Sequence, residues 1–184
     1  MSTGRRLLLA FLLAAAPAAA KVFLTQDEAL KLAFPPGTVV ERRTSYLSAE
    51  QKAEVKRLAG SEPSGLAVAY VGTRDGHESG TAYFETHVVR TQAETLLVVV
   101  TPDGALGRVE VLSFAEPEEY LPRVGWYGQL PGKRLDDELT PKRGVRPVTG
   151  ATLTVRATSE AARRVLALHQ VLRRPVAASG GPAR

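Results

Sequence analysis

The stretch that decides the fold is TLLVVVTPDGALGRVEVLSF, residues 95–114. Two runs rich in valine and leucine, 95–101 and 106–114, flank the sequence Pro102-Asp103-Gly104. Aliphatic β-branched residues favour strands, and proline, aspartate and glycine together are typical of a tight reversal of the chain. Strands joined by so short a turn are antiparallel. The stretch therefore predicts a β-hairpin.

Two further strand-like runs precede this hairpin. Residues 66–71 read LAVAYV, the turn sequence Arg74-Asp75-Gly76 follows, and a longer run extends over 80–89. Turn residues between apolar runs again indicate antiparallel neighbours. We therefore expect four antiparallel strands in succession, and the run 38–46 is also rich in β-branched residues.

Helical patterns lie on both sides of these strands. Thr25 with Glu28, and Ser48 with Gln51, have the spacing of a capping box, which predicts short helices over about 25–34 and 48–60. A stronger helix is predicted over about 158–172, because apolar residues recur there at three- and four-residue steps. The expected fold is α+β: an antiparallel sheet of about four or more strands with helices packed on it, the last one following a Thr-Gly-Ala-Thr loop.

The chain begins with the pattern of a secretory signal peptide. Arg5 and Arg6 precede an apolar run over 7–16, and the small residues 18–20 lead to Lys21. The apolar run is shorter than the ~20 residues that a membrane-spanning helix needs. We expect an exported protein, periplasmic or at the outer face of the cytoplasmic membrane, with a signal over 1–20 that is either cleaved or kept as an anchor.

Removal of this segment leaves 164 of the 184 residues, enough for one domain. We expect a single domain over 21–174, with a helical N-terminal extension (21–60) and a core (66–172). The tail 175–184 is composed of small residues, proline and arginine, which predicts disorder.

Charge and cysteine content exclude several kinds of function. Without Arg5 and Arg6 the chain carries 22 basic and 19 acidic residues, a mild excess that does not indicate a nucleic-acid partner. There is no cysteine, which excludes disulfides, thiolate nucleophiles and cysteine-held metal clusters. Redox chemistry in this chain would therefore depend on a bound cofactor.

The segment with the clearest chemical character is Val148-Thr-Gly-Ala-Thr-Leu-Thr154, just before the last helix. Glycine permits close approach of the backbone, alanine adds little bulk, and a helix N-terminus offers unpaired N–H groups. Such a loop suits a phosphate. The alternative is that these threonines only cap the helix and shape a turn.

The segment resembles the flavinylation motif of the FMN-binding domain family, Asp-x-x-Ser/Thr-Gly-Ala-Thr. This family includes subunits of the Na⁺-translocating NADH:quinone oxidoreductase and of the Rnf complex, and small exported proteins. Thr149, Gly150, Ala151 and Thr152 match the motif, and Thr154 belongs to its usual continuation. The resemblance implies FMN joined to Thr152 through a phosphoester by a flavin transferase, and electron exchange with a membrane redox complex or cytochrome. It implies an electron carrier more than a self-sufficient enzyme.

One position departs from the motif, because its leading aspartate is replaced by Arg146. Loss of that carboxylate would weaken recognition by the transferase, whereas an arginine could pair with a phosphate. Besides covalent attachment at Thr152, two alternatives therefore stay open. One is a module that binds FMN or another phosphorylated ligand noncovalently, and the other is a flavin-free domain that interacts with a membrane complex.

Two aromatic side chains outside the motif are further candidates for flavin contact. His87 lies in a strand run on one face with Glu85 and Val89, and either lines the flavin site or is satisfied by its own neighbours. Trp126 either covers the flavin ring or anchors a long loop. No histidine pair has metal-ligand spacing, and no serine lies in a nucleophile-elbow sequence, so we expect neither a metal site nor a catalytic triad.

Overall fold

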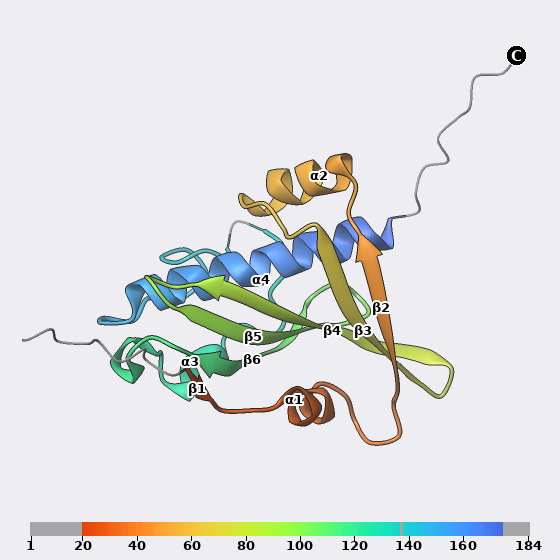
Figure 1. Ribbon diagram of the computed structural model, residues 1–184, viewed down its shortest axis with the longest axis horizontal. Coiled ribbons are helices and arrows are strands. Elements are labelled where there is room, and N and C mark those ends of the chain that lie inside the picture. Colours follow the sequence, from red (N-terminus) through yellow and green to blue (C-terminus); the bar gives the residue numbers. More distant parts are fainter. Residues whose placement is uncertain (1–19, 137, 175–184) are drawn as a thin grey trace, which may run out of the picture.

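Six antiparallel strands form one sheet in this computed structural model, which describes residues 20–136 and 138–174 (Figure 1). Strands β2 (Val39–Tyr46), β3 (Leu66–Arg74), β4 (His77–Val88), β5 (Ala93–Val100) and β6 (Leu106–Phe114) follow one another as neighbours. The short β1 (Lys21–Val22) pairs with the outer edge of β6. The predicted α+β class and the predicted hairpins are confirmed.

Turn chemistry accounts for the hairpins. Asp75 and Gly76 between β3 and β4 both have positive φ, 50° and 76°, as a two-residue reversal requires. Between β5 and β6, the Thr101 hydroxyl donates to the Asp103 carboxylate (2.6 Å), and Gly104 has a φ of 82°. Both reversals are therefore encoded by residues within the turns themselves.

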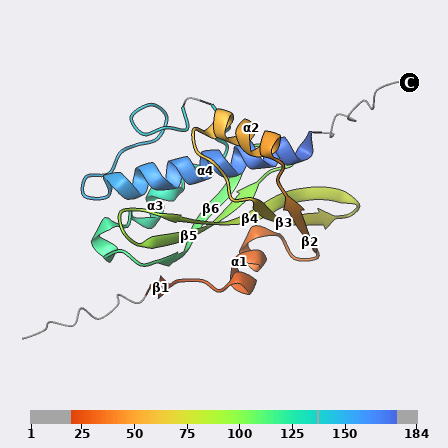
Figure 2. The ribbon, with the colours of Figure 1, turned by 45° about the horizontal axis from the view of Figure 1, so that its top comes forward.

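Helices cover the two faces of the sheet unequally. The long α4 (Thr152–Arg173) lies across one face with α2 (Ala49–Ala59) beside it, and α1 (Gln26–Ala33) lies on the other (Figures 1 and 2). Alternate residues of β5 serve the two cores: Leu96 and Val98 pack with α4, and Leu97 packs on the α1 side. The sheet is thus the middle of three layers.

Both predicted capping boxes are present. In α1 the Thr25 hydroxyl accepts the Glu28 N–H, and the Glu28 carboxylate accepts the Thr25 N–H. Ser48 and Gln51 make the same reciprocal pair at the start of α2. The sequence spacing alone therefore locates where these two short helices begin.

The last helix begins earlier than the pattern predicts. It starts at Thr152, within the Thr-Gly-Ala-Thr segment, and not near 158. The positions that face the sheet in its first turns hold Thr154 and Thr158, which are fully buried. The apolar periodicity misses these turns because threonines occupy core positions.

The segment between β6 and α4 contains the expected turns and short helical pieces. These are a 3₁₀ turn, η1 (Glu118–Tyr120), and a single helical turn, α3 (Val124–Tyr127). Trp126, Tyr127 and Leu130 are buried in the α4-side core and anchor the segment.

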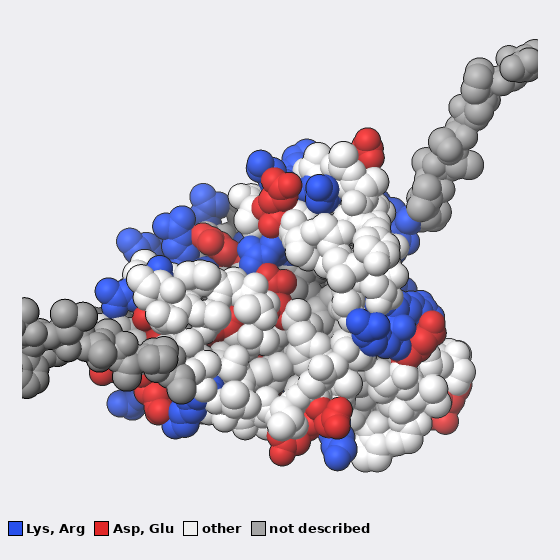
Figure 3. Space-filling view, in the orientation of Figure 1, with Lys and Arg blue, Asp and Glu red and all other residues white. Residues whose placement is uncertain are grey.

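Charges of both signs are interspersed on the face shown in Figure 3. The expected signal segment, up to residue 19, and the tail 175–184 lie outside the described residues. Within the described part of the chain, no helix is both long enough and apolar enough to cross a membrane.

Close packing of α1 on the sheet gives a stability prediction. A methyl group on Gly72 would lie 2.5 Å from the Phe34 ring, whereas a methyl on the exposed Gly65 would meet nothing within 4 Å. We expect Gly72→Ala to lower the free energy of unfolding by about 1–3 kcal/mol, because the ring must shift in a packed core. Gly65→Ala should change it by less than about 0.5 kcal/mol. Urea unfolding measures both, and equal midpoints for the two variants would contradict this packing.

Candidate functional site

The Thr-Gly-Ala-Thr segment forms a tight turn that leads directly into α4. The Ala151 N–H donates to the Val148 carbonyl (3.2 Å), and Gly150 has a φ of 86°, a left-handed conformation that favours glycine. The helix begins at Thr152, directly after Ala151, and no side chain caps it. The glycine is therefore required by the backbone conformation, since a Cβ there would meet nothing within 4 Å.

Thr152 is the first residue of the helix. Its side chain is exposed, and its Oγ1 is 3.4 Å from the Val148 carbonyl, a long contact. The Thr154 hydroxyl is instead buried and donates to the Tyr120 carbonyl (2.5 Å). Thr149 is exposed one residue before Gly150.

A small cavity of 170 Å³ opens at this helix start. Residues 150–154 form one wall, and Arg90 and Tyr120 form the other. The Arg90 guanidinium lies 4.5 Å from the centre of the Tyr120 ring, within cation–π range. The cavity therefore combines exposed backbone, a hydroxyl and one positive side chain.

The loop that carries Arg90 is held by Glu116. Its carboxylate accepts hydrogen bonds from the N–H groups of Thr91 (2.6 Å) and Gln92 (2.9 Å). These bonds, led by the one from Thr91, lower the pKa of the Glu116 carboxyl below its usual range. The position of Arg90 is thus tied to the segment that follows β6.

The electrostatics of the cavity favour an anion. The first N–H groups of a helix have no intrahelical partner and carry the positive end of the helix dipole. Arg90 adds a full positive charge on the facing wall. A phosphate at this position would meet both, so the arrangement suits phosphate binding.

Three of the residues predicted to contact flavin, Thr149, His87 and Trp126, do not line this cavity. His87 is under α4, where its Nε2 is 2.9 Å from the Glu94 carboxylate. Trp126 is buried and donates from Nε1 to the Arg146 carbonyl (2.7 Å). The His87 and Trp126 side chains contact Glu94 and the Arg146 backbone and do not line the cavity of the motif.

His87 belongs to a buried polar group on the sheet. Glu94 is fully buried and also accepts from the Thr158 hydroxyl (3.3 Å) in the second turn of α4. Burial, and then the Glu94 charge, raise the pKa of the nearby Tyr127. These contacts connect the α4-facing side of β4 and β5 to the helix that carries Thr152.

The backbone at Arg146 is held from two sides. Its N–H donates to the Gln129 side-chain oxygen (2.8 Å), and its carbonyl accepts from the Trp126 indole (2.7 Å). The residue itself is exposed. The position of the motif's missing aspartate is therefore well defined, with an arginine side chain in its place.

The sequence pattern does not mark Arg90, Tyr120 or Glu116 as site residues. Each comes from a segment distant in sequence from the motif, and only the strand register and the path after β6 bring them together. The one available signal was a basic residue directly after a strand. Among the described residues, no group of three or more histidines and carboxylates could hold a metal ion.

The lowered pKa of Glu116 predicts a pH effect. Its stabilising contribution is present above the carboxyl's unfolded pKa of about 4.3 and is lost as pH falls through the lower folded value. Between roughly pH 5 and pH 3, the free energy of unfolding should therefore depend less on pH in the Glu116→Gln variant than in the unmodified protein. Glu119→Gln, which removes an exposed carboxylate from the same segment, is the control. Parallel pH profiles for Glu116→Gln and the unmodified protein would show that these bonds do not act as described.

Comparison with known proteins gives a distant structural similarity. No model of a known protein family matches the chain, and no curated protein matches it. Among solved structures, the chain is similar to the crystal structure of Shewanella oneidensis NqrC, with a TM-score of 0.47 and 19% identity, over 77% of this chain and 73% of that one. Similarity at this level is a distant resemblance in fold and assigns no function to the chain.

Proposed function

We propose that this protein carries FMN, joined through its phosphate to the Thr152 hydroxyl, and passes electrons between other redox proteins. The observation that carries the proposal is the Thr-Gly-Ala-Thr turn at an uncapped helix start, with Thr152 exposed beside a cavity that Arg90 lines. Bound FMN would supply one- and two-electron chemistry that the chain's own side chains lack.

The contacts at Thr152 support attachment at this residue. A transferase must reach the acceptor oxygen, and Thr152 is exposed while Thr154 is buried and already bonded to Tyr120. The donor would be a flavin dinucleotide, in which FMN is joined to a nucleotide through a phosphoanhydride. The Thr152 oxygen loses its proton and bonds to the flavin-side phosphorus, the P–O bond to the nucleotide phosphate breaks, and the nucleoside monophosphate leaves with the proton. The adduct therefore adds the mass of FMN less that of water.

The surrounding residues would hold the phosphate once it is attached. Arg90 would pair with its charge, and the N–H groups at the start of α4 would donate to its oxygens. Gly150 keeps that approach free of side chains. His87 and Trp126 would act indirectly, through the sheet under α4 and the backbone at Arg146.

The proposal extends to location and partners. The arginine-led apolar segment at the N-terminus supports export, where a covalent bond prevents loss of the cofactor by dilution. A flavin transferase would install FMN, and a membrane redox complex or cytochrome would exchange electrons with it.

Noncovalent FMN binding is the second candidate, favoured by Arg146. An exposed arginine replaces the aspartate of the motif, which removes a carboxylate from the region that a transferase would recognise. Denaturation of the purified protein separates the two candidates. Covalent flavin stays with the polypeptide, whereas noncovalent flavin leaves with the solvent.

Intact mass after co-expression with a flavin transferase tests the attachment point. The unmodified protein should gain the mass of FMN less water, and Thr152→Val should gain nothing, because it removes only the hydroxyl. Thr152→Ser should retain the adduct. Thr149→Val, the same change at the other exposed threonine of the motif, should still acquire it. An unmodified protein with neither adduct nor bound flavin would refute the proposal and favour a flavin-free interaction domain.

The departure at Arg146 gives a second measurement. If transferases recognise the motif's aspartate, Arg146→Asp should raise the flavinylated fraction at a fixed reaction time. The backbone there is held by Gln129 and Trp126, so the change should leave the turn in place. Arg143→Asp alters charge equally in the same segment and is the control. An equal or smaller flavinylated fraction in Arg146→Asp would show that this position does not limit the reaction.

A further inference from the structure

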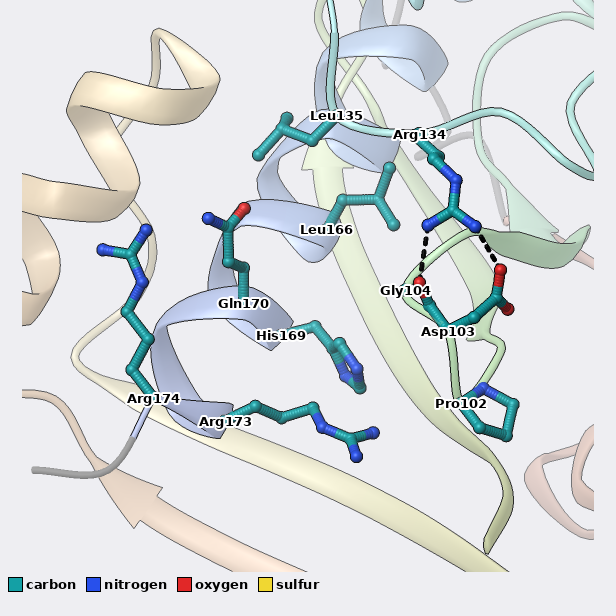
Figure 4. Close-up of a pocket in the computed structure, with 10 residues that line it drawn as sticks. All are labelled: Pro102, Asp103, Gly104, Arg134, Leu135, Leu166, His169, Gln170, Arg173 and Arg174. Atoms are coloured by element: carbon teal, nitrogen blue, oxygen red, sulfur yellow. Dashed lines mark hydrogen bonds and ion pairs between the residues drawn. The ribbon is translucent and has the colours of Figure 1, made fainter.

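A second and larger cavity lies at the opposite end of α4 (Figure 4). Its volume is 520 Å³, and its walls are the last turns of α4, the β5–β6 turn and the segment 134–135. Thr152 and His169 are 17 residues apart on one helix, which is ~25 Å along its axis. This cavity is therefore separate from the Thr152 site, and nothing in the proposed function uses it.

His169 contributes a buried hydrogen-bonding atom without a partner. The residue is only 4% exposed, its Nδ1 is 2.9 Å from the Tyr83 hydroxyl, and its Nε2 has no hydrogen-bond partner among the described residues. Burial, and then the Arg173 charge, lower the pKa of His169 to about 4, so the ring is neutral near pH 7. A buried polar atom without a partner is uncommon and indicates a missing ligand or water.

The Tyr83 hydroxyl determines what that atom offers. Burial raises the pKa of Tyr83, so the hydroxyl keeps its proton. If Tyr83 donates to Nδ1, only Nε2–H is left without a hydrogen-bond partner. If Nδ1–H donated to the tyrosine oxygen instead, both the tyrosine proton and the Nε2 lone pair would lack a partner. Nε2 is therefore the protonated nitrogen. His169 lines the large cavity and also a smaller one that Tyr83 lines, and its Nε2–H is the donor of this wall that has no partner.

Arg173 lies one helical turn beyond His169 on the same face, and Figure 4 shows both side chains directed toward the β5–β6 turn. Its Nη1 donates to Glu78 (2.8 Å), which leaves other N–H groups of the guanidinium available. Among the residues that line this cavity, Asp103 supplies a carboxylate, which already accepts hydrogen bonds from Arg134 and Thr101. The hydrogen-bonding groups that remain free in this wall are therefore mainly N–H donors.

The rest of the wall is apolar. Pro102, Leu135 and Leu166 line the cavity beside these donors. A bare inorganic anion would leave this apolar surface uncovered, and a molecule without an acceptor oxygen would leave the remaining N–H groups of Arg173 and the His169 N–H unpaired. Cavities of this size with a few convergent polar groups are typical of small-molecule sites.

We propose that the cavity binds a small organic carboxylate, held by Arg173 and the His169 Nε2–H, with its apolar body against Pro102, Leu135 and Leu166. Two donors one helical turn apart can address the two oxygens of one carboxylate. The apolar residues select for an aromatic or branched aliphatic body.

Benzoate is a suitable ligand for the test, added to the full chain with or without flavin. Calorimetry should show saturable binding, and NMR should show the His169 ring as the Nε2–H tautomer, with a shift that follows the same curve. Arg173→Gln should weaken binding by at least about tenfold, since it removes the charged partner. Arg156→Gln is the matched control: this arginine is also on α4 and also pairs with a glutamate (Glu160, 2.8 Å), and binding should be unchanged.

Three results would overturn the proposal. The first is an absence of saturable benzoate binding to the unmodified protein. The second is equal binding of benzyl alcohol or of inorganic phosphate, which would mean that the carboxylate or the apolar body is not recognised. The third is equal weakening in Arg173→Gln and Arg156→Gln. The comparison of ligands uses only the unmodified protein, so the test holds even if Arg173→Gln does not fold.

Discussion

The contact of the first two turns of α4 with the sheet and with η1 is the constraint on which the candidate site depends. Thr154 and Thr158 are fully buried there, and their hydroxyls donate to the Tyr120 carbonyl and to the Glu94 carboxylate. Buried polar groups are stabilising only when paired, so these contacts admit one placement of the helix and not a range of them. The same placement brings the start of α4 to the loop that carries Arg90. The geometry at Thr152 is therefore a consequence of how the helix is anchored below it.

The three helices of eight residues or more differ in how their first turns are satisfied. α1 and α2 are closed by reciprocal side-chain caps, Thr25 with Glu28 and Ser48 with Gln51. α4 is the longest, and its N-cap, Ala151, has no side chain that can accept a hydrogen bond. A missing cap typically costs about 1 kcal/mol, so the open end of α4 is stabilised elsewhere, by the buried threonines and the large apolar face. An open helix start with a positive side chain opposite is what an anion needs.

The features that could be predicted from the sequence are those encoded locally. Pro102 to Gly104 specifies its hairpin, and the two capping boxes specify where α1 and α2 begin, because the interacting groups lie within a few residues of one another. The start of α4 could not be predicted from apolar periodicity, since threonines take the place of aliphatic residues in its first turns. Nor could the pairing of β1 with β6, which depends on only two residues. Arg90 and Tyr120 lie near the motif because of the strand register and the path of a long irregular segment. Their spacing in the sequence does not predict that proximity.

The two sites proposed at the ends of α4 would bind an anion by different means. At the N-terminus the backbone itself favours negative charge, so an arginine and a glycine turn are sufficient additions. At the C-terminus the dipole opposes an anion, and a site there must be built from side chains. The proposed carboxylate site would draw on Arg134, Arg173 and Arg174 in the cavity wall and on the N–H of a neutral histidine. Glu78 and Glu54 pair with Arg173 and Arg174 and hold them in place, which reduces the conformational entropy that a ligand's carboxylate would have to overcome.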